Sequence, residues 1–277
     1  MSLMSVNTNR GAMIALQSLA AINRELAITQ NRISTGLKIA SPKDNGAIWA
    51  IAQGQRAESK AYDAVIASLQ RGQSAVDVGL AAGETVSDLL MQMREKMLAA
   101  SDPSLTTGSR KALDQDYRML RDQIDRTVGS ADFSGLNLVG PANVAKGVRA
   151  LADTRGVSTI GVDAIDLSTT GGLLAGLPAD LTNLNSQVDL PIMTSAMDKV
   201  NAAVGRLGTG SKALDTHLTF VRKMQDVLDT SVGRLVDADM AVESARLQSL
   251  QVMQQLAVQA LSIANRTPSL LLQLFQR

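Results

Sequence analysis

The sequence contains no cysteine among its 277 residues and a single histidine, His217. Without cysteine there is no disulfide framework and no thiol nucleophile. A zinc site or a general acid–base pair needs companion side chains at suitable spacing, and a lone histidine has none. We therefore expect no catalytic residue, no metal site, no cofactor site and no enzyme activity.

Aromatic residues make up only 2% of the chain, with one Trp, two Tyr and three Phe. The core of a globular enzyme usually draws on such side chains for burial. Here Ala, Leu, Val, Ile and Met must supply the core, a composition that favours long helices packed side by side. The net charge of +1 and the scarcity of rings that could stack on bases argue against a nucleic-acid partner.

Long hydrophobic runs are also missing. No uncharged apolar stretch reaches the roughly 18 residues of a membrane-spanning helix, so we expect no membrane partner. The first residues show no basic segment that leads into an uninterrupted apolar core, so we expect no cleaved Sec leader. Export of this chain would then use a route that does not depend on such a leader.

What the sequence does contain is a long helical stripe between residues 197 and 235. Apolar side chains recur there in alternating steps of three and four, which is the 3.5-residue period of a coiled-coil seam. Two seam positions, Ser211 and Gln225, are polar, and such residues cost stability but can fix the register. The seam comprises Met197, Val200, Val204, Leu207, Ser211, Leu214, Leu218, Val221, Gln225, Leu228, Val232 and Leu235.

A second helical stripe, between residues 65 and 97, carries glycine at three of its positions, Gly72, Gly79 and Gly83. Glycine weakens a helix locally, but it also lets another backbone come very close. We therefore expect these three glycines to be close-contact positions. The sequence Asp-Pro-Ser at 102–104 predicts the end of this helix.

The central segment differs from the rest of the chain. After a third helix expected over 104–128, Gly, Thr, Ser and Pro become frequent between residues 133 and 190. Alternating apolar residues there predict short strands, at Ile160, Val162, Ile165 and Leu167. The prediction is a mainly α fold, with long antiparallel helices in a coiled-coil bundle and a small β element in the central segment.

The two ends of the chain resemble each other, since both are rich in Gln and Asn and poor in charge. Each carries an apolar stripe that one helix cannot bury by itself, so the ends must pair with each other, with the middle of the chain or with other copies. We expect the following residues to form a subunit interface of core helices: Leu16, Leu19, Ile22, Leu26, Ile33, Leu37, Leu247, Leu250, Met253, Leu256, Leu261, Ala264, Leu271 and Phe275.

Two short patterns superficially suggest ligand sites. The run 205–212, GRLGTGSK, is similar to a phosphate-binding loop, but it lies inside the helical stripe with no strand before it. Asp237 and Asp239 are too few for a cation site, and they fit the start of a helix, where carboxylates cap free N–H groups.

Several longer motifs resemble those of bacterial flagellins. The segment 237–265, DADMAVESARLQSLQVMQQLAVQALSIAN, is similar to the C-terminal signature of that family, which runs from an acidic helix start to a closing Ala-Asn. The segments SVNTN at 5–9, RISTGLKIASPKDN at 32–45 and FSGLNL at 133–138 resemble its N-terminal half. The motifs lie in the family's order and cover about residues 1–140 and 190–277.

The resemblance implies a domain organisation. Residues 1–42 and 235–277 would be the N-terminal and C-terminal helices of an inner core domain. Residues 43–190 would form the N-terminal part of a helical rod domain, with a small β region at about 133–190. Residues 191–234 would supply the C-terminal helix of the rod. Flagellins often carry a long insertion at the centre, whereas this chain has about 50 residues there, so it resembles a near-minimal flagellin without large outer domains.

The resemblance also implies a function. The chain would be a structural subunit that polymerises into the bacterial flagellar filament, a propeller for motility, and it would be secreted to the extracellular flagellum. Implied partners are other copies in a helical homopolymer, the flagellar hook-associated and cap proteins, the type III flagellar export apparatus and an export chaperone at the C-terminal helix. The end helices would become ordered as the subunits assemble.

Three alternatives remain open at this point. A hook–filament junction protein shares flagellin-like ends but usually has a larger middle. An enzyme is a second possibility because some flagellins carry a protease insertion, yet the central His-Glu-x-x-His motif that it needs is absent. A secreted translocator that contacts membranes usually shows a long apolar hairpin, which this sequence lacks.

Overall fold

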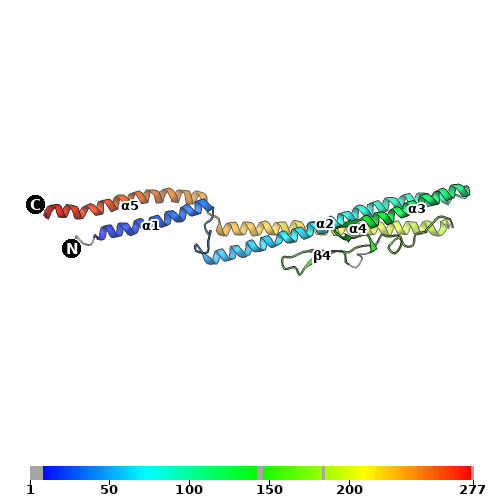
Figure 1. Cartoon of the computed structure of the whole chain (residues 1–277), viewed down its shortest axis with the longest axis horizontal. Helices are drawn as coiled ribbons and strands as arrows, with labels where there is room; N and C mark the ends of the chain where they lie inside the picture. Colours follow the sequence, from blue (N-terminus) through cyan, green and yellow to red (C-terminus); the bar gives the residue numbers. More distant parts are fainter. Residues whose placement is uncertain (1–8, 142–145, 183–184, 276–277) are drawn as a thin grey trace. The chain divides into compact units, whose positions relative to one another are not determined.

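The computed structural model describes residues 9–141, 146–182 and 185–275, with side chains described as far as residue 266 (Figure 1). Most of these residues belong to long helices, and two small antiparallel sheets lie between the third and fourth helices. The predicted fold class, mainly α with a small central β element, is confirmed. The helices are α1 (Arg10–Thr35), α2 (Gly46–Ala100), α3 (Thr107–Ser130), α4 (Ser186–Val236) and α5 (Met240–Phe275).

The chain divides into two compact units. Unit 1 combines Met1–Ala57 with Val227–Arg277, and unit 2 is the continuous segment Glu58–Asp226. Unit 1 therefore contains α1, α5, the first part of α2 and the last part of α4. Unit 2 contains the rest of those two helices, α3 and all the described strands.

Helix α1 ends at Thr35, earlier than the expected limit at residue 42. Gly36 adopts a left-handed conformation, with φ at 70°, and its N–H donates to the carbonyl of Arg32 at 2.8 Å. This arrangement terminates a helix because it satisfies a free carbonyl while turning the chain away from the axis. The following residue, Leu37, then pairs as an isolated antiparallel bridge with Asp237.

Helix α4 begins at Ser186, upstream of residue 191, where the resemblance places the start of the C-terminal rod helix. Asn185 accepts a hydrogen bond from the N–H of Gln187 at 3.2 Å, while its own N–H donates to Asp189 at 2.8 Å. These reciprocal capping contacts begin the helix before Pro191, which it then incorporates.

Unit 2 has a broad hydrophobic core of its own. Helices α2, α3 and α4 and the central strands all contribute to it, and Tyr117 is fully buried at its centre. The Tyr117 hydroxyl donates to the carbonyl of Pro178 at 3.0 Å, and burial raises the pKa of Tyr117 above its ordinary value. The largest fully buried side chains of this core also include Leu69, Leu90, Met93, Met97, Ile124 and Leu207.

The β element consists of two hairpins. Strands β1 (Asp132–Phe133) and β2 (Leu136–Asn137) are joined by Ser134 and Gly135, which both have positive φ, at 54° and 82°. Two consecutive positive φ values are the requirement of a tight hairpin turn of this kind. Strands β3 (Val148–Leu151) and β4 (Thr159–Val162) pair antiparallel, with Val148 opposite Val162.

Two of the four residues expected in strands lie outside the named ones. Ile160 and Val162 belong to β4, but Ile165 and Leu167 follow it. Their N–H groups donate to the carbonyls of Leu138 and Val139, at 2.8 and 2.9 Å. This segment is therefore held by backbone bonds to a distant part of the chain, which the local alternation could not specify.

The three glycines of α2 are buried in unit 2, and their close neighbours belong to the same chain. A Cβ atom at Gly72 would lie 3.0 Å from Val148 of β3, and one at Gly79 would lie 3.3 Å from Leu138. At Gly83 it would lie 2.7 Å from Val204 of α4, a distance that real Cβ contacts do not reach. The glycines therefore let strand β3 and helix α4 approach the α2 backbone.

The polar positions of the α4 seam have partners on α2. Gln225 donates from Nε2 to Asp63 at 2.7 Å and to the Ser59 carbonyl at 3.3 Å, and the Ser211 hydroxyl donates to Asp77 at 3.4 Å. Such directional contacts favour one register of the two helices over neighbouring ones. The run 205–212 lies inside α4, as expected.

Candidate functional site

Helices α1 and α5 lie side by side and run antiparallel in unit 1 (Figure 1). At one end the side-chain amide of Asn9 donates to the carbonyl of Ala264 at 2.7 Å. At the other end Leu37 bridges to Asp237, and the N–H of Ala238 donates to the carbonyl of Gly36 at 2.9 Å. The two ends of the sequence thus pair with each other, which was one of the three possibilities left open.

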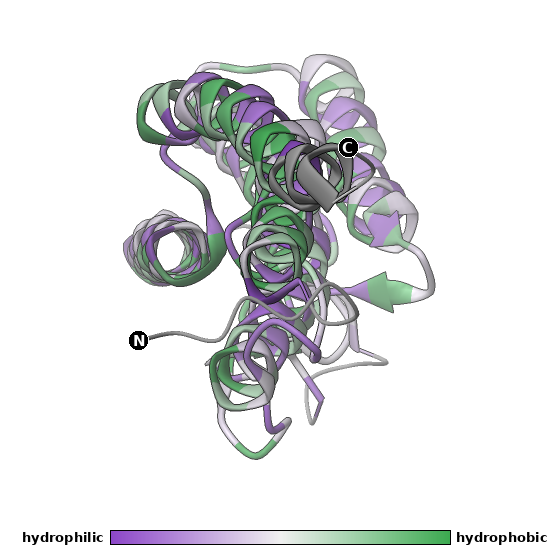
Figure 2. Ribbon diagram, turned by 90° about the vertical axis from the view of Figure 1, so that its left-hand side faces the viewer, coloured by the Kyte–Doolittle hydropathy of each residue, from purple (hydrophilic) through white to green (hydrophobic). Residues whose placement is uncertain are grey.

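The pairing uses one narrow seam. On both helices the buried and half-buried residues recur in steps of three and four, as in a coiled coil. Glu25 and Arg32 of α1 are also half-buried, but each lies beside this series and does not belong to it. Figure 2 shows hydrophobic and hydrophilic residues interleaved along the helices. The seam residues are Ala12, Ala15, Leu19, Ile22, Leu26, Thr29 and Ile33 of α1, and Glu243, Leu247, Leu250, Gln254, Ala257, Leu261 and Ala264 of α5.

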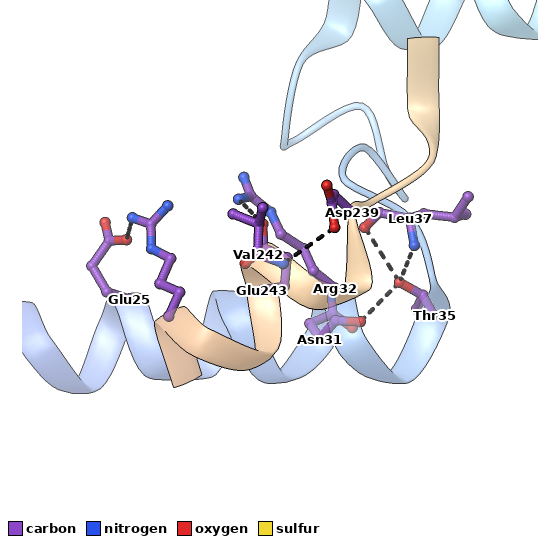
Figure 3. Close-up of polar contacts among 9 residues, drawn as sticks. Glu25, Asn31, Arg32, Thr35, Leu37, Asp239, Val242 and Glu243 are labelled. Carbon is purple, nitrogen blue, oxygen red and sulfur yellow. Dashed lines mark hydrogen bonds and ion pairs between the residues drawn. The ribbon is translucent and has the colours of Figure 1, made fainter. Parts of the chain in front are cut away.

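Polar contacts close the end of the pair where α1 stops and α5 starts (Figure 3). Asp239 accepts hydrogen bonds from the N–H groups of Ala241 and Val242, at 3.0 and 3.2 Å, so it caps α5 as the sequence predicts. The Thr35 hydroxyl donates to the carbonyl of Asn31 at 2.8 Å. These local bonds satisfy backbone groups that a helix end would otherwise leave free.

An ion pair crosses the seam beside this cap. Arg32 Nη1 lies 2.9 Å from Glu243 Oε1, and the Glu243 side chain is only 9% exposed (Figure 3). Its second oxygen, Oε2, and the buried hydroxyl of Thr29 have no hydrogen-bond partner among the described residues. Burying polar atoms without a partner costs free energy, so this layer of the seam specifies the pairing while limiting its stability.

Two exposed polar contacts continue along the pair. Arg246 lies 2.6 Å from Glu25, with both side chains about half exposed, and Gln254 donates to Asn23 at 2.7 Å. Exposed ion pairs contribute about 0–1 kcal/mol. They therefore add to the register of the helices more than to the stability of their pairing.

A small hydrophobic cluster lies where the chain leaves α1. It comprises the buried residues Ile39, Ala52, Val232 and Val236, with Leu37, Ile48, Trp49 and Leu235 packed against them. The connecting turn is held by Asp44, which accepts hydrogen bonds from the Ser41 N–H and hydroxyl and from the Ala40 N–H. These bonds, with the charge of Arg32, lower the pKa of Asp44 below its ordinary value.

Both helices also carry apolar side chains on the face away from the seam. We call Ile14, Ile28, Val242, Leu256 and Ile263 the outer stripe, and these residues are between 42% and 68% exposed. All of them except Val242 lie two residues beyond a seam residue, about 200° further around the helix. The intrachain seam leaves these side chains exposed. Exposed apolar side chains that recur along a helix in this way make this face a candidate interaction site.

The predicted interface residues fall into separate groups. Leu16, Met253 and Leu256 are exposed, and Leu37 packs on the small cluster. The side chains of Leu271 and Phe275 lie outside those that the structure describes. The remaining predicted residues line the seam between α1 and α5: Leu19, Ile22, Leu26, Ile33, Leu247, Leu250, Leu261 and Ala264.

Most of the outer stripe was missed at the sequence level. Of its members, Leu256 alone was among the predicted interface residues. The signal is present, because Ile14, Ala21 and Ile28 are seven residues apart, as are Leu256 and Ile263. This repeat is offset by two positions from the seam, and only the burial pattern distinguishes the two series.

No reactive site emerges in the described ranges. Among these residues no group of three His, Cys, Asp or Glu side chains could hold a metal ion, and no helix is long and apolar enough to cross a bilayer. His217 is half-buried, with Nε2 2.8 Å from the carbonyl of Ala152. The exposed apolar side chains of the α1/α5 pair make its surface the best candidate for a functional site.

Comparison with known proteins gives the same family at both ends of the chain. Residues 6–142 match the bacterial flagellin N-terminal helical region, and residues 190–275 match the bacterial flagellin C-terminal helical region. Flagellin FljK of Caulobacter vibrioides is 49% identical over 280 residues, with 100% of both chains covered. Flagellin C of Rhizobium meliloti is 33% identical over 321 residues, covering 98% of this chain and 99% of that protein.

A solved structure shares the fold. A putative flagellar hook-associated protein from Vibrio parahaemolyticus superposes with a TM-score of 0.57, covering 70% of this chain and 100% of that one. At 16% sequence identity this likeness concerns the fold alone. The full-length relatives and the two matched regions decide the matter: the chain belongs to the bacterial flagellins, the self-polymerising structural subunits of the flagellar filament.

Proposed function

We propose that the chain builds the filament by packing the outer stripe of its α1/α5 pair against neighbouring copies. The observation that carries this proposal is the presence of two apolar faces on each helix, of which the intrachain seam covers only one. Further exposed apolar side chains, among them Leu16, Val252 and Val258, widen the available surface. Because the contacts join different surfaces of successive copies, they do not close, and a helical polymer grows.

The energetics favour ordering that is coupled to assembly. Fixing the backbone costs about 1–2 kcal/mol per residue. Burying a Leu, Ile or Val side chain contributes roughly 1.5–3 kcal/mol. Among the described residues of the α1/α5 pair, only the seam is buried within one subunit. We propose that neighbouring copies supply the remaining burial, so that the α1/α5 pair becomes fully ordered in the filament.

This proposal assigns different parts of the chain to different layers of the filament. Residues 1–42 and 235–277 would form the inner core of the filament, and residues 43–190 and 191–234 would form the surrounding rod. The intrachain approach at Gly72, Gly79 and Gly83 supports a further role, in which small shifts of the rod helices let subunits adopt alternative packings.

The partners follow from the same role. We propose export through the type III flagellar apparatus to the extracellular flagellum, with hook-associated and cap proteins at the filament ends. An export chaperone would cover the C-terminal helix α5 before assembly. The exposed apolar side chains of α5 support this expectation, because such a surface needs protection in the free subunit.

The test replaces the outer stripe. Leu256→Gln and Ile263→Gln each place a polar amide where a neighbour would pack, and we expect the critical concentration for polymerisation to rise at least tenfold. The matched control is Val157→Gln, which makes the same change at a residue of unit 2 that is 82% exposed. Sedimentation and electron microscopy measure assembly, and thermal unfolding checks the subunit. Normal filaments from both stripe variants would refute the proposal.

A further inference from the structure

The chain has twelve methionines and no cysteine. Peroxide-type oxidants attack thiolates and thioethers, so in this chain the methionine sulfur is the principal target. Which methionines react then depends on their exposure.

The methionines differ in exposure, and three of the exposed ones lie on α1 and α5. Met93, Met97 and Met193 are fully buried in the core of unit 2. Met13, Met240 and Met253 are 44–54% exposed on α1 and α5, and none of them is a seam residue. They lie among the apolar side chains that the proposed function assigns to contacts between copies.

We infer that Met13, Met240 and Met253 form an oxidation-sensitive site that controls assembly, an inference that rests on the proposed function. In the free subunit a peroxide reaches each thioether. The sulfur lone pair attacks one peroxide oxygen, the O–O bond breaks, a sulfoxide S=O bond forms and water leaves. The sulfur is oxidised by two electrons and the peroxide is reduced.

The sulfoxide changes the surface without changing the fold. It replaces an apolar, flexible group with a polar acceptor, which would be buried without a donor when subunits pack. The core of unit 2 stays intact because the methionines that belong to it, Met93, Met97 and Met193, are fully buried. Packing of copies also covers the three residues, so the assembled filament resists the oxidant that stops the free subunit.

The site is reversible in principle. A methionine sulfoxide reductase with a thiol reductant returns the thioether, the sulfoxide oxygen leaves as water and the thiols become a disulfide. Because the chain has no cysteine, the reductant acts on no disulfide of the protein itself.

The experiment treats purified subunits with hydrogen peroxide, locates sulfoxides by peptide mass spectrometry and measures the critical concentration by sedimentation. We expect sulfoxides at the three residues and a rise in the critical concentration of at least tenfold, equivalent to about 1.4 kcal/mol per subunit. The thermal unfolding of unit 2 should be unchanged, and reductase treatment should restore the original critical concentration. Filaments oxidised after assembly should retain unmodified methionine at these positions. Untreated subunits that fail to polymerise would contradict the proposed function, whereas treated subunits that polymerise normally would overturn only this inference.

Matched variants locate the effect. Methionine-to-leucine changes conserve volume and apolarity, so Met13→Leu/Met240→Leu/Met253→Leu subunits should polymerise normally and resist peroxide. The control Met91→Leu/Met119→Leu changes two methionines of unit 2 that are 51% and 65% exposed, and it should remain sensitive. A triple variant that stays sensitive, or a control that becomes resistant, would overturn the assignment.

Discussion

The two units bury their hydrophobic residues in different ways. Unit 2 encloses a broad core to which three helices and the strands contribute, with side chains such as Tyr117 and Leu90 fully buried. Unit 1 has one seam between two helices and a small cluster around Val236. Its seam also includes Thr29 and Glu243, which are polar and incompletely satisfied. Unit 2 therefore buries its core within one chain, whereas we propose that the α1/α5 pair gains most of its stability from other copies.

The largest test of this comparison truncates one leucine in each unit. Leu90→Ala should lower the free energy of unfolding of the isolated subunit by about 2–5 kcal/mol, because it opens a cavity in a closed core. Leu250→Ala, in the α1/α5 seam, should leave subunit unfolding nearly unchanged and lower the temperature at which filaments dissociate. Urea unfolding and filament melting measure the two effects. Equal loss of subunit stability in both variants would show that the pair is already as well packed as the core.

A smaller effect is expected at the ion pair of the seam. Arg32→Leu leaves the buried Glu243 carboxylate without its partner and should destabilise filaments by about 1–3 kcal/mol. The double variant Arg32→Leu/Glu243→Leu should recover much of this loss, because an apolar pair can replace a buried ion pair. Thermal dissociation of filaments made from each variant measures the difference. A double variant weaker than the single one would indicate that the pair contributes net stability.

The smallest expected effect is a pH dependence of stability. It arises at one turn in each unit, so the two turns can be compared. Hydrogen bonds from Ser41 lower the pKa of Asp44 in unit 1, and bonds from Ser104 lower the pKa of Asp102 in unit 2. In the folded protein both side chains favour the ionised form. Their contribution to stability is therefore present above the unfolded pKa of about 3.9. It is lost as the pH falls through the lower folded pKa.

Two matched variants separate these contributions. Asp44→Asn should reduce the acid dependence of filament dissociation below about pH 4. Asp102→Asn should affect acid unfolding of the isolated subunit instead. Light scattering and circular dichroism during acid titration follow the two processes. An Asp44→Asn variant with the acid profile of the unmodified filament would contradict the role given to this turn.

Periodicity in the sequence was enough to predict the long helices. The seam of α4 and the positions of Leu19, Leu26 and Ile33 follow from seven-residue spacing, because burial against a neighbouring helix imposes that spacing. The cap at Asp239 was also predictable, since its effect is local. The fold class rests on signals of this kind.

Other features depended on contacts that the local sequence does not encode. The α1/α5 seam and the outer stripe have equal periods, so spacing alone could not assign either to an intrachain partner. Ile165 and Leu167 bond to residues far away in the chain. The start of α4 at Ser186, before Pro191, depends on capping by Asn185, a signal that the predicted start at residue 191 did not use.

The bond from Asn9 to Ala264 joins residues 255 positions apart, and this separation has a kinetic consequence. Closing so long a loop in a disordered chain is entropically costly and slow, because nothing holds its ends together beforehand. Once unit 2 has folded, the Gln225 side chain donates a hydrogen bond to the Ser59 carbonyl. The two chain segments that lead out of unit 2 therefore start close together. The loop that remains to be closed then excludes residues 60–224. We therefore expect the chain to fold from its middle outwards, with the pairing of its ends as the last step.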